Sequence, residues 1–399
     1  MRPDLLQTLA ARVAEREHAG LLRRVRTFDA SEDVRVRIDH RELLNFCSND
    51  YLGLAQDPRI IRALQNAATG CGVGGTAAHL VCGHRREHAQ LEEALCEWTG
   101  REAALLFSSG WLANLGIMQA LLERDAVCVQ DKLNHASLLD AAHLAGAALK
   151  RYPHNDAEAA ARQLAAAPDR PALLATDGVF SMDGDLAPLR VLASLCRRES
   201  ATLMVDDAHG LGVLGPHGAG SLEEAALTQT DAPVLMATLG KALGCMGAFV
   251  AGSQALIEGL AQFARTFVYT TAMPPALAAA AREAVRIARS EDWRRDKLRA
   301  LIARFRASAA QLGLPLADSP TAIQPIVLGK AEQAVAASHA LEHAGCLVTA
   351  IRPPTVPAGR ARLRVTLSAA HEERDVDQLL DALARVITPS PPTPLEGKG

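Results

Sequence analysis

Residues 202–209 read TLMVDDAH, a short apolar run that ends in two aspartates and a histidine. Apolar runs of this length, bounded by turns, predict buried strands. Comparable runs occur at 103–107 (AALLF), 126–130 (AVCVQ), 171–180 (PALLATDGVF), 234–240 (VLMATLG) and 247–252 (GAFVAG). Because longer helical patterns separate these runs, they predict an α/β fold with a mostly parallel sheet covered by helices on both faces.

Four polar residues stand at or just beyond the ends of these runs: Asp206, His209, Thr238 and Lys241. In open α/β sheets, ligands bind beyond the carboxyl ends of the strands. Lys241 lies in TLGKALGCMG, where glycines leave room for a flat ring against the backbone, as a Schiff-base lysine requires. A lone lysine in a loop is more often solvated, so its neighbours decide its interpretation.

Asp206 and His209 are suited to serve such a ring. A carboxylate directed at a pyridine nitrogen keeps that nitrogen protonated, so that the ring accepts the electron pair of a carbanion. His209 could hydrogen-bond a ring hydroxyl oxygen. In the alternative interpretation, Asp206 caps a helix and His209 is a satisfied core histidine. We interpret Asp207 as structural.

Three further motifs complete the candidate site. In FSSGW, Gly110 and Trp111 open a helical pattern, and the free N–H groups of a helix start suit a phosphate. In DKLNHAS, His135 follows a strand and could stack on a planar cofactor. Arg352, between a strand and a Pro-Pro turn, could grip a carboxylate in bidentate fashion. Each motif alone is also compatible with an ordinary turn or a surface residue.

The pattern divides the chain into four parts. We expect an N-terminal helical segment over 1–45, a large domain over 46–285, a small C-terminal domain over 286–388 and a disordered tail over 389–399. A helical connector at about 276–311 leads into the small domain, which carries the strand candidates AIQPIVLG, CLVTAI and RLRVTLSA.

Composition argues against several classes of protein. Of the 399 residues, 49% are hydrophobic and 22% are charged, which is typical of a globular protein. The net charge of −3 argues against binding to a nucleic-acid backbone. The eight cysteines are scattered without a CxxC pair, which predicts reduced thiols and neither a metal site nor a disulfide framework. Because no secretory signal and no long apolar run occur, we expect a soluble cytoplasmic protein with no membrane contact.

Together these motifs resemble the alpha-oxoamine synthase family of fold-type-I pyridoxal-phosphate enzymes. The resemblance covers nearly the whole chain. It is carried by LLNFCSNDYLGL, GGTAAHLVCGH, FSSGW, DKLNHASLLDAA, DGVFSMDGD, VDDAHGLGVLG, TLGKALG, VYTTAMPP and TAIRPPTVPAGRARLRVTLSAAH. It implies a large domain with a mostly parallel sheet, a smaller C-terminal α+β domain and pyridoxal 5'-phosphate as cofactor.

The resemblance also implies residue roles. Lys241 would bind the cofactor as a Schiff base, Asp206 would pair with its pyridine nitrogen, His209 would contact its ring oxygen, and His135 would stack on the ring. Further cofactor contacts would be Gly110, Trp111, Ser181 and Thr238, with Thr270 and Thr271 reaching the neighbouring subunit's phosphate. Substrate contacts would be Arg23, Asn49, His135, Arg352 and Thr355. The resemblance therefore implies a homodimer with shared active sites.

The implied reaction is the decarboxylative condensation of an amino acid with an acyl thioester. IRPPTVPAG is most similar to the family members of biotin biosynthesis, which implies L-alanine and a pimeloyl thioester of coenzyme A or acyl carrier protein as substrates. A glycine-using synthase of the same family and an aminotransferase on the same fold are the alternatives. Two residues depart from the family pattern: Trp111 replaces a commoner phenylalanine or tyrosine, which could alter the cleft width, and Leu211 replaces a frequent threonine hydroxyl.

Overall fold

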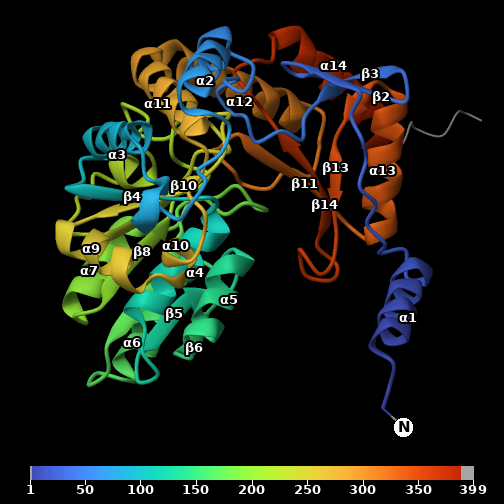
Figure 1. Cartoon of the computed structure of the whole chain (residues 1–399). Helices are drawn as coiled ribbons and strands as arrows, with labels where there is room; N and C mark the ends of the chain where they lie inside the picture. The colour runs from blue at the N-terminus through green and yellow to red at the C-terminus, as the bar shows by residue number, and fades with distance from the viewer. Residues whose placement is uncertain (1, 388–399) are drawn as a thin grey trace, which may run out of the picture.

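A seven-stranded sheet forms the centre of the large domain (Figure 1). The computed structural model describes residues 2–387. The strand order is β4-β10-β9-β8-β7-β5-β6, and only β10 is antiparallel to its neighbours, so the predicted mostly parallel sheet is confirmed. The strands are β4 (Ala103–Phe107), β5 (Val127–Asp131), β6 (Ala148–Tyr152), β7 (Ala172–Asp177), β8 (Thr202–Asp206), β9 (Val234–Thr238) and β10 (Ala248–Gly252).

Helices cover both faces of this sheet, because successive residues of a strand point to opposite sides. In β7, Leu173 and Ala175 pack into one apolar cluster, whereas Leu174 packs into another. The first cluster includes α4 (Gly110–Leu121), α5 (Ala136–Ala145) and α9 (Gln254–Phe263), and the second includes α6 (Ala157–Ala165) and α7 (Leu189–Arg198). Three further helices lie at the β4 edge of the sheet: α2 (Pro58–Cys71), α3 (Arg86–Thr99) and α11 (Pro275–Ser290). The remaining helical elements of this domain are short: η1 (His79–Gly83), α8 (Ser221–Glu224) and α10 (Arg265–Val268).

The small domain has the α+β architecture that the sequence predicts. In its three-stranded sheet, β11 (Ile323–Gly329) and β13 (Thr349–Ile351) pair antiparallel with β14 (Ala361–Thr366). The helices of this domain are α12 (Asp292–Gln311), α13 (Ala331–His343) and α14 (Glu373–Ile387). The predicted connector at about 276–311 consists of two helices, α11 and α12, which meet at Glu291.

The N-terminal segment differs from its prediction. Within 1–45, only α1 (Leu5–His18) is helical, and it is followed by β1 (Ala30–Glu32), β2 (Arg35–Ile38) and β3 (Arg41–Asn45). β3 pairs in parallel with β12 (Cys346–Leu347), which joins these strands to the small domain. The helical prediction is wrong here because RVRI alternates with the period of a strand, and its Val36 and Ile38 are buried.

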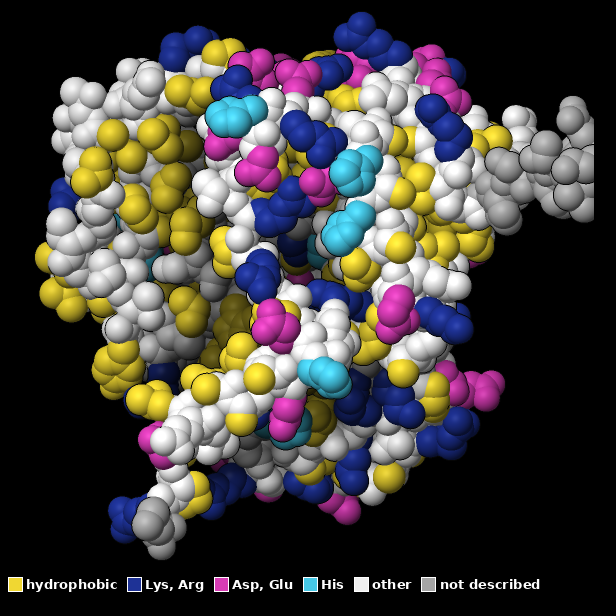
Figure 2. All heavy atoms as spheres, turned by 90° about the vertical axis from the view of Figure 1, so that its right-hand side faces the viewer, with side chains coloured by type: hydrophobic (Ala, Val, Ile, Leu, Met, Phe, Trp, Pro, Cys, Tyr) yellow, Lys and Arg dark blue, Asp and Glu magenta, His cyan; other side chains and the backbone are white. Residues whose placement is uncertain are grey.

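Helix α1 projects from the body of the protein, as Figures 1 and 2 show. Asp4 caps its start by accepting the backbone N–H groups of Leu6 and Gln7, but none of its residues is buried. Within residues 2–387, no helix is both long and apolar enough to cross a membrane. The tail predicted over 389–399 lies outside the described residues.

Candidate active site

A pocket of about 190 Å³ lies beyond the carboxyl ends of the parallel strands. Asp177, Asp206 and Thr238 end the neighbouring strands β7, β8 and β9, so their side chains meet at one edge of the sheet. Eight residues predicted to contact a cofactor line this pocket: Gly110, Trp111, His135, Ser181, Asp206, His209, Thr238 and Lys241. The fold therefore brings together side chains whose motifs lie far apart in the sequence.

A chain of hydrogen bonds starts at the Lys241 amine. Lys241 Nζ lies 3.0 Å from His209 Nε2, and His209 Nδ1 lies 2.6 Å from the Tyr51 hydroxyl. The Tyr51 hydroxyl in turn donates to Asn49 Oδ1 at 3.3 Å. Burial lowers the pKa of His209 well below its usual range and raises the pKa of Tyr51 to about 12, so both side chains are neutral near pH 7. His209 thus accepts from the lysine at Nε2 and donates to Tyr51 through Nδ1.

Burial lowers the pKa of Lys241, although the carboxylates of Asp206 and Asp177 act in the opposite direction. A lowered pKa increases the fraction of neutral amine, which can attack an aldehyde or accept a proton. Gly244 allows the lysine loop to approach its neighbour closely: its φ is +63°, and a Cβ there would lie 2.3 Å from the backbone nitrogen of Ala55. Gly244 therefore lets the lysine loop pack against residues 54 and 55, whereas room for a flat ring beside Lys241 stays a prediction.

Asn114 orients the Asp206 carboxylate. Its Nδ2 donates to Asp206 Oδ2 and to Ser137 Oγ, both at 2.8 Å, while the Ala208 N–H donates to Asp206 Oδ1 at 3.1 Å. Asn114, Ser137 and Asp206 are all buried, so these contacts are shielded from water. The sequence-based search did not select Asn114. The signal that could have found it is its position one helical turn after Gly110, on the helix that starts at the pocket.

His135 caps the start of α5 and lines the pocket. Its Nδ1 lies 2.7 Å from Ser137 Oγ, and its backbone N–H donates to Asp177 Oδ2 at 2.7 Å. Partial burial lowers the pKa of His135, which favours a neutral imidazole with a face available for stacking. Trp111 meets the imidazole edge-on, with ring centroids 5.9 Å apart. Asp177 is a second buried carboxyl that the sequence-based search missed, and burial together with Asp206 raises its pKa.

The start of α4 faces the same pocket. Ser109 caps this helix, and the first backbone N–H groups, which include those of Gly110 and Trp111, have no acceptor within the helix. Thr238 also lines the pocket, but its hydroxyl donates to the carbonyl of Gly247 at 2.9 Å. A contact from Thr238 to a phosphate would require this hydroxyl to turn, so that role stays a prediction.

Arg352 is not among the residues that line the pocket. Its guanidinium donates to the backbone carbonyls of Gly20 and Leu22, at 2.8 Å for Leu22. The arginine expected to grip a carboxylate therefore holds the segment that follows α1.

Arg364 of β14 is the arginine beside the pocket. It is buried, its Nε donates to the Ser181 carbonyl at 2.7 Å, and its terminal nitrogen donates to Asn49 Oδ1 at 3.3 Å. The sequence-based search missed this residue. The signal was present in RLRVT, because an arginine within an otherwise buried strand needs a buried polar partner.

A second cavity, of about 520 Å³, shares His135 and Ser181 with the pocket. Arg23 and Thr355, both predicted to contact substrate, line this cavity, and Arg23 donates to the Thr355 hydroxyl at 2.8 Å. The contact joins the segment after α1 to the loop between β13 and β14. The two predicted substrate residues therefore meet at this cavity rather than at the lysine.

Thr270 and Thr271 line neither of these two cavities. Thr271 is exposed and forms an antiparallel bridge with Ala78, in the glycine-rich run at 70–84. That run packs closely on the same segment, since a Cβ on Gly75 would lie 2.2 Å from the Ala272 carbonyl oxygen. Within one chain, therefore, the two threonines and this run form an outer surface.

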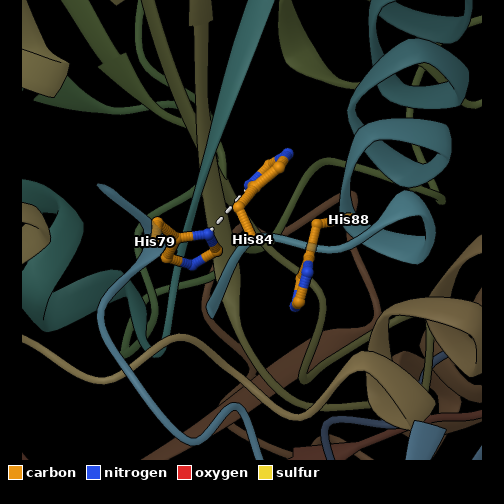
Figure 3. Close-up of side chains that lie close together, drawn as sticks. All are labelled: His79, His84 and His88. Atoms are coloured by element: carbon orange, nitrogen blue, oxygen red, sulfur yellow. Dashed lines mark hydrogen bonds between the residues drawn. The ribbon is translucent and has the colours of Figure 1, made fainter. Parts of the chain in front are cut away.

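Three histidines, His79, His84 and His88, gather in and beside the same run (Figure 3). Their ligand atoms lie within 4.8 Å of one another, and His79 Nδ1 lies 3.0 Å from His84 Nδ1. Burial lowers the pKa of all three, to about 4 for His79. However, His88 accepts the Arg85 N–H at Nδ1 and donates to the Met273 carbonyl through Nε2, so both its ring nitrogens are engaged. Protein hydrogen bonds thus account for His88 without a metal ion.

The family model for aminotransferase class I and II matches residues 41–383. The chain belongs to this family. An 8-amino-7-oxononanoate synthase from Alkalilimnicola ehrlichii is 58% identical over 384 residues, which cover 96% of this chain and 97% of that protein. A solved 8-amino-7-oxononanoate synthase from Francisella tularensis superposes with a TM-score of 0.75 and 30% identity, over 86% of this chain and 97% of that chain. A serine palmitoyltransferase from S. paucimobilis, solved with a bound PLP–myriocin aldimine, has a TM-score of 0.91 and 26% identity, over 96% of this chain and 98% of that chain.

The pocket of this aminotransferase class I and II protein fits pyridoxal phosphate. The cofactor needs an amine for its aldehyde, a carboxylate for its pyridine nitrogen and an anion-binding end for its phosphate. Lys241 and Asp206 supply the first two, and the start of α4 supplies the third.

Proposed function

We propose that this chain joins L-alanine to a pimeloyl thioester, with loss of carbon dioxide and free thiol, to give 8-amino-7-oxononanoate in biotin biosynthesis. The observation that carries the proposal is the 58% identity, over nearly the whole chain, with a relative named for this product. The pocket supports it, because Lys241, Asp206 and His209 meet beyond the strand ends as a pyridoxal-phosphate enzyme requires. A cytoplasmic location is part of the same proposal.

Pyridoxal phosphate, when bound, supplies an aldehyde that captures amines and a ring that accepts the electron pair of a carbanion. Lys241 would hold it through Nζ, and the same amine would take the proton from the substrate Cα and later return one. The lowered pKa of Lys241, caused by burial, favours the first of these transfers. Asp206, oriented by Asn114, would serve the ring nitrogen, while neutral His209 holds Nζ in position. His135 and Ser181 would border the ring, and Gly110 and Trp111 its phosphate.

The alanine carboxylate needs a cation, and two arginines compete for that role. We expect Arg364→Lys to raise the KM for L-alanine by about tenfold to a hundredfold, because a lysine cannot reproduce the bidentate grip of a buried guanidinium. Arg352→Lys is the matched control, since Arg352 contacts backbone carbonyls near the N-terminus. Steady-state kinetics with each substrate varied in turn measures both effects. If the KM for L-alanine were unchanged in the Arg364 variant and raised in the Arg352 variant, Arg352 would be the residue that binds the alanine carboxylate, as the sequence predicts.

A homodimer with shared active sites belongs to the proposal. The surface that carries Thr270 and Thr271 also exposes large apolar side chains: Val81 is 76% exposed and Tyr269 is 72% exposed. Val81 lies in η1 and Tyr269 follows α10, which are neighbouring elements, and a contiguous patch of exposed apolar side chains marks a surface for binding another protein. A second copy placed there would bring these threonines toward its own pocket, as the resemblance implies.

Direct assay tests the reaction. The purified protein, loaded with cofactor and given L-alanine and a pimeloyl thioester, is expected to release one carbon dioxide for each 8-amino-7-oxononanoate identified by mass. Turnover of glycine without release of carbon dioxide would favour a glycine-using relative instead. Amino transfer to a keto acid, with no product that depends on the thioester, would favour an aminotransferase.

A further inference from the structure

The rim of the second cavity carries cations that lack carboxylate partners. Arg23, Lys132, Arg151 and Arg360 line this cavity, and within residues 2–387 none of them has a carboxylate oxygen within 4.0 Å. Other surface arginines do have such partners; Arg304, for example, pairs with carboxylates of α14. A concave site with an excess of one charge concentrates ligands of the opposite charge. The rim is therefore suited to an anion.

Among residues 2–387, a single carboxylate lines this cavity, and it is already neutralised. Asp183 forms an ion pair with Arg362 at 2.7 Å, and the Arg362 side chain is almost fully buried. This pair therefore does not cancel the charge of the exposed cations. An incoming anion meets cations and no free carboxylate among the residues that line the cavity.

Two domains supply the cations, and a contact with the backbone holds the side chain of one of them, Arg151. Lys132 follows β5, Arg151 lies on the neighbouring strand β6, and the Arg151 guanidinium donates to the Lys132 carbonyl. Arg360 comes from the loop before β14, in the small domain. All three side chains are exposed, so they can reach a ligand without a rearrangement of the core.

The cavity adjoins the reaction pocket. His135 and Ser181 line both spaces, and the apolar side chains of Leu133, Leu139 and Met182 also line the cavity. A ligand that occupies both spaces therefore meets reactive groups in the pocket, and apolar side chains and positive charge in the cavity. A thioester on a pantetheine arm that ends in a phosphate offers groups that suit all three.

We propose that Lys132, Arg151 and Arg360 bind the phosphate of the pantetheine arm that carries the acyl group. The inference rests on the proposed function and adds residues that select the acyl donor. Coenzyme A and acyl carrier protein share this phosphate ester, so the site recognises their common chemistry. The three residues position the donor and take no part in proton transfer, because they do not line the pocket that contains Lys241.

Two donors that differ by one phosphate test the proposal: pimeloyl-phosphopantetheine and pimeloyl-pantetheine. The holoenzyme and its Lys132→Ala, Arg151→Ala and Arg360→Ala variants are assayed with both. Lys150→Ala is the matched control, because Lys150 is an exposed neighbour of Arg151 that does not line the cavity. Each rim variant is expected to raise the KM for the phosphorylated donor by about tenfold, which corresponds to about 1.4 kcal/mol. The KM for the donor without phosphate, the KM for L-alanine and kcat should not change.

The proposal would be overturned if the three variants raised the KM equally for both donors, or raised the KM for neither donor. Pimeloyl-coenzyme A and pimeloyl-acyl carrier protein, assayed with the same variants, distinguish the two sources; an effect confined to coenzyme A would also overturn it, because the shared phosphate would then not be the group recognised. Titration of the holoenzyme with phosphopantetheine and pantetheine separates this inference from the reaction. Binding that depends on the phosphate and the rim, in a protein that makes no product, would sustain the site and refute the proposed function.

Discussion

Lys241→Ala is expected to abolish turnover and to remove the absorbance band that the cofactor gains when it is bound to the lysine. The substitution removes both the amine that captures the aldehyde and the base that accepts the Cα proton. General-base catalysis alone is worth about 100- to 10,000-fold, so we expect kcat to fall at least about 1,000-fold. An absorbance spectrum of the purified variant with added cofactor, followed by product analysis, measures both effects.

Lys150→Ala serves as control, since this lysine is exposed on β6 and does not line the pocket. Its spectrum and turnover should match those of the unmodified protein. A coloured, active Lys241→Ala protein would show that another amine holds the cofactor, and the assignment of the pocket would fail. Thermal unfolding of the cofactor-free proteins should agree closely, which excludes misfolding as the cause of lost activity.

Asp206→Asn is expected to lower kcat by about 100- to 1,000-fold while cofactor still binds. An amide has nearly the shape of the carboxylate, but it carries no charge to keep the facing ring nitrogen protonated, so the ring accepts electrons less readily. The loss should appear in kcat for each amino acid tested, because it concerns the common carbanion step. Stopped-flow measurement of Cα proton release with deuterated alanine isolates that step.

Asp207→Asn is the matched control for this substitution. The Asp207 side chain is buried, accepts the Ser221 N–H at 2.8 Å, and has its pKa raised to about 7 by burial. It does not line the pocket, so its variant should retain kcat even if its stability changes. If the two variants lost activity equally, the special role of Asp206 would be refuted.

The sheet and most of the pocket could be predicted because their signals are local. A strand is indicated by an apolar run of five or six residues, and parallel strands place their ends at one edge, so Asp206 and Lys241 could be expected at the same edge of the sheet. The cofactor assignment needed only this rule and the resemblance of the motifs. Contacts within one motif, such as that of His135 with Ser137, follow from the same local logic.

Residues whose role depends on distant packing were not predictable in this way. Arg364 meets the Ser181 carbonyl across two domains, and no spacing in the sequence encodes that contact. Arg352 has the expected rigid flanks, but the segment at 20–22 occupies its guanidinium. The sequence could place Asn114 on a helix, but its hydrogen bond to Asp206 depends on how that helix packs against the sheet.

The parallel pairing of β3 with β12 has a consequence for synthesis of the chain. Leu44 and its partner Cys346 stand near opposite ends of the sequence, so the first strands emerge from the ribosome long before their partner exists. The large domain can fold during this interval, whereas the backbone groups along the edge of β3 stay unpaired and exposed to solvent. A chain interrupted before β12 would therefore leave an open strand edge, the kind of surface through which nascent proteins aggregate.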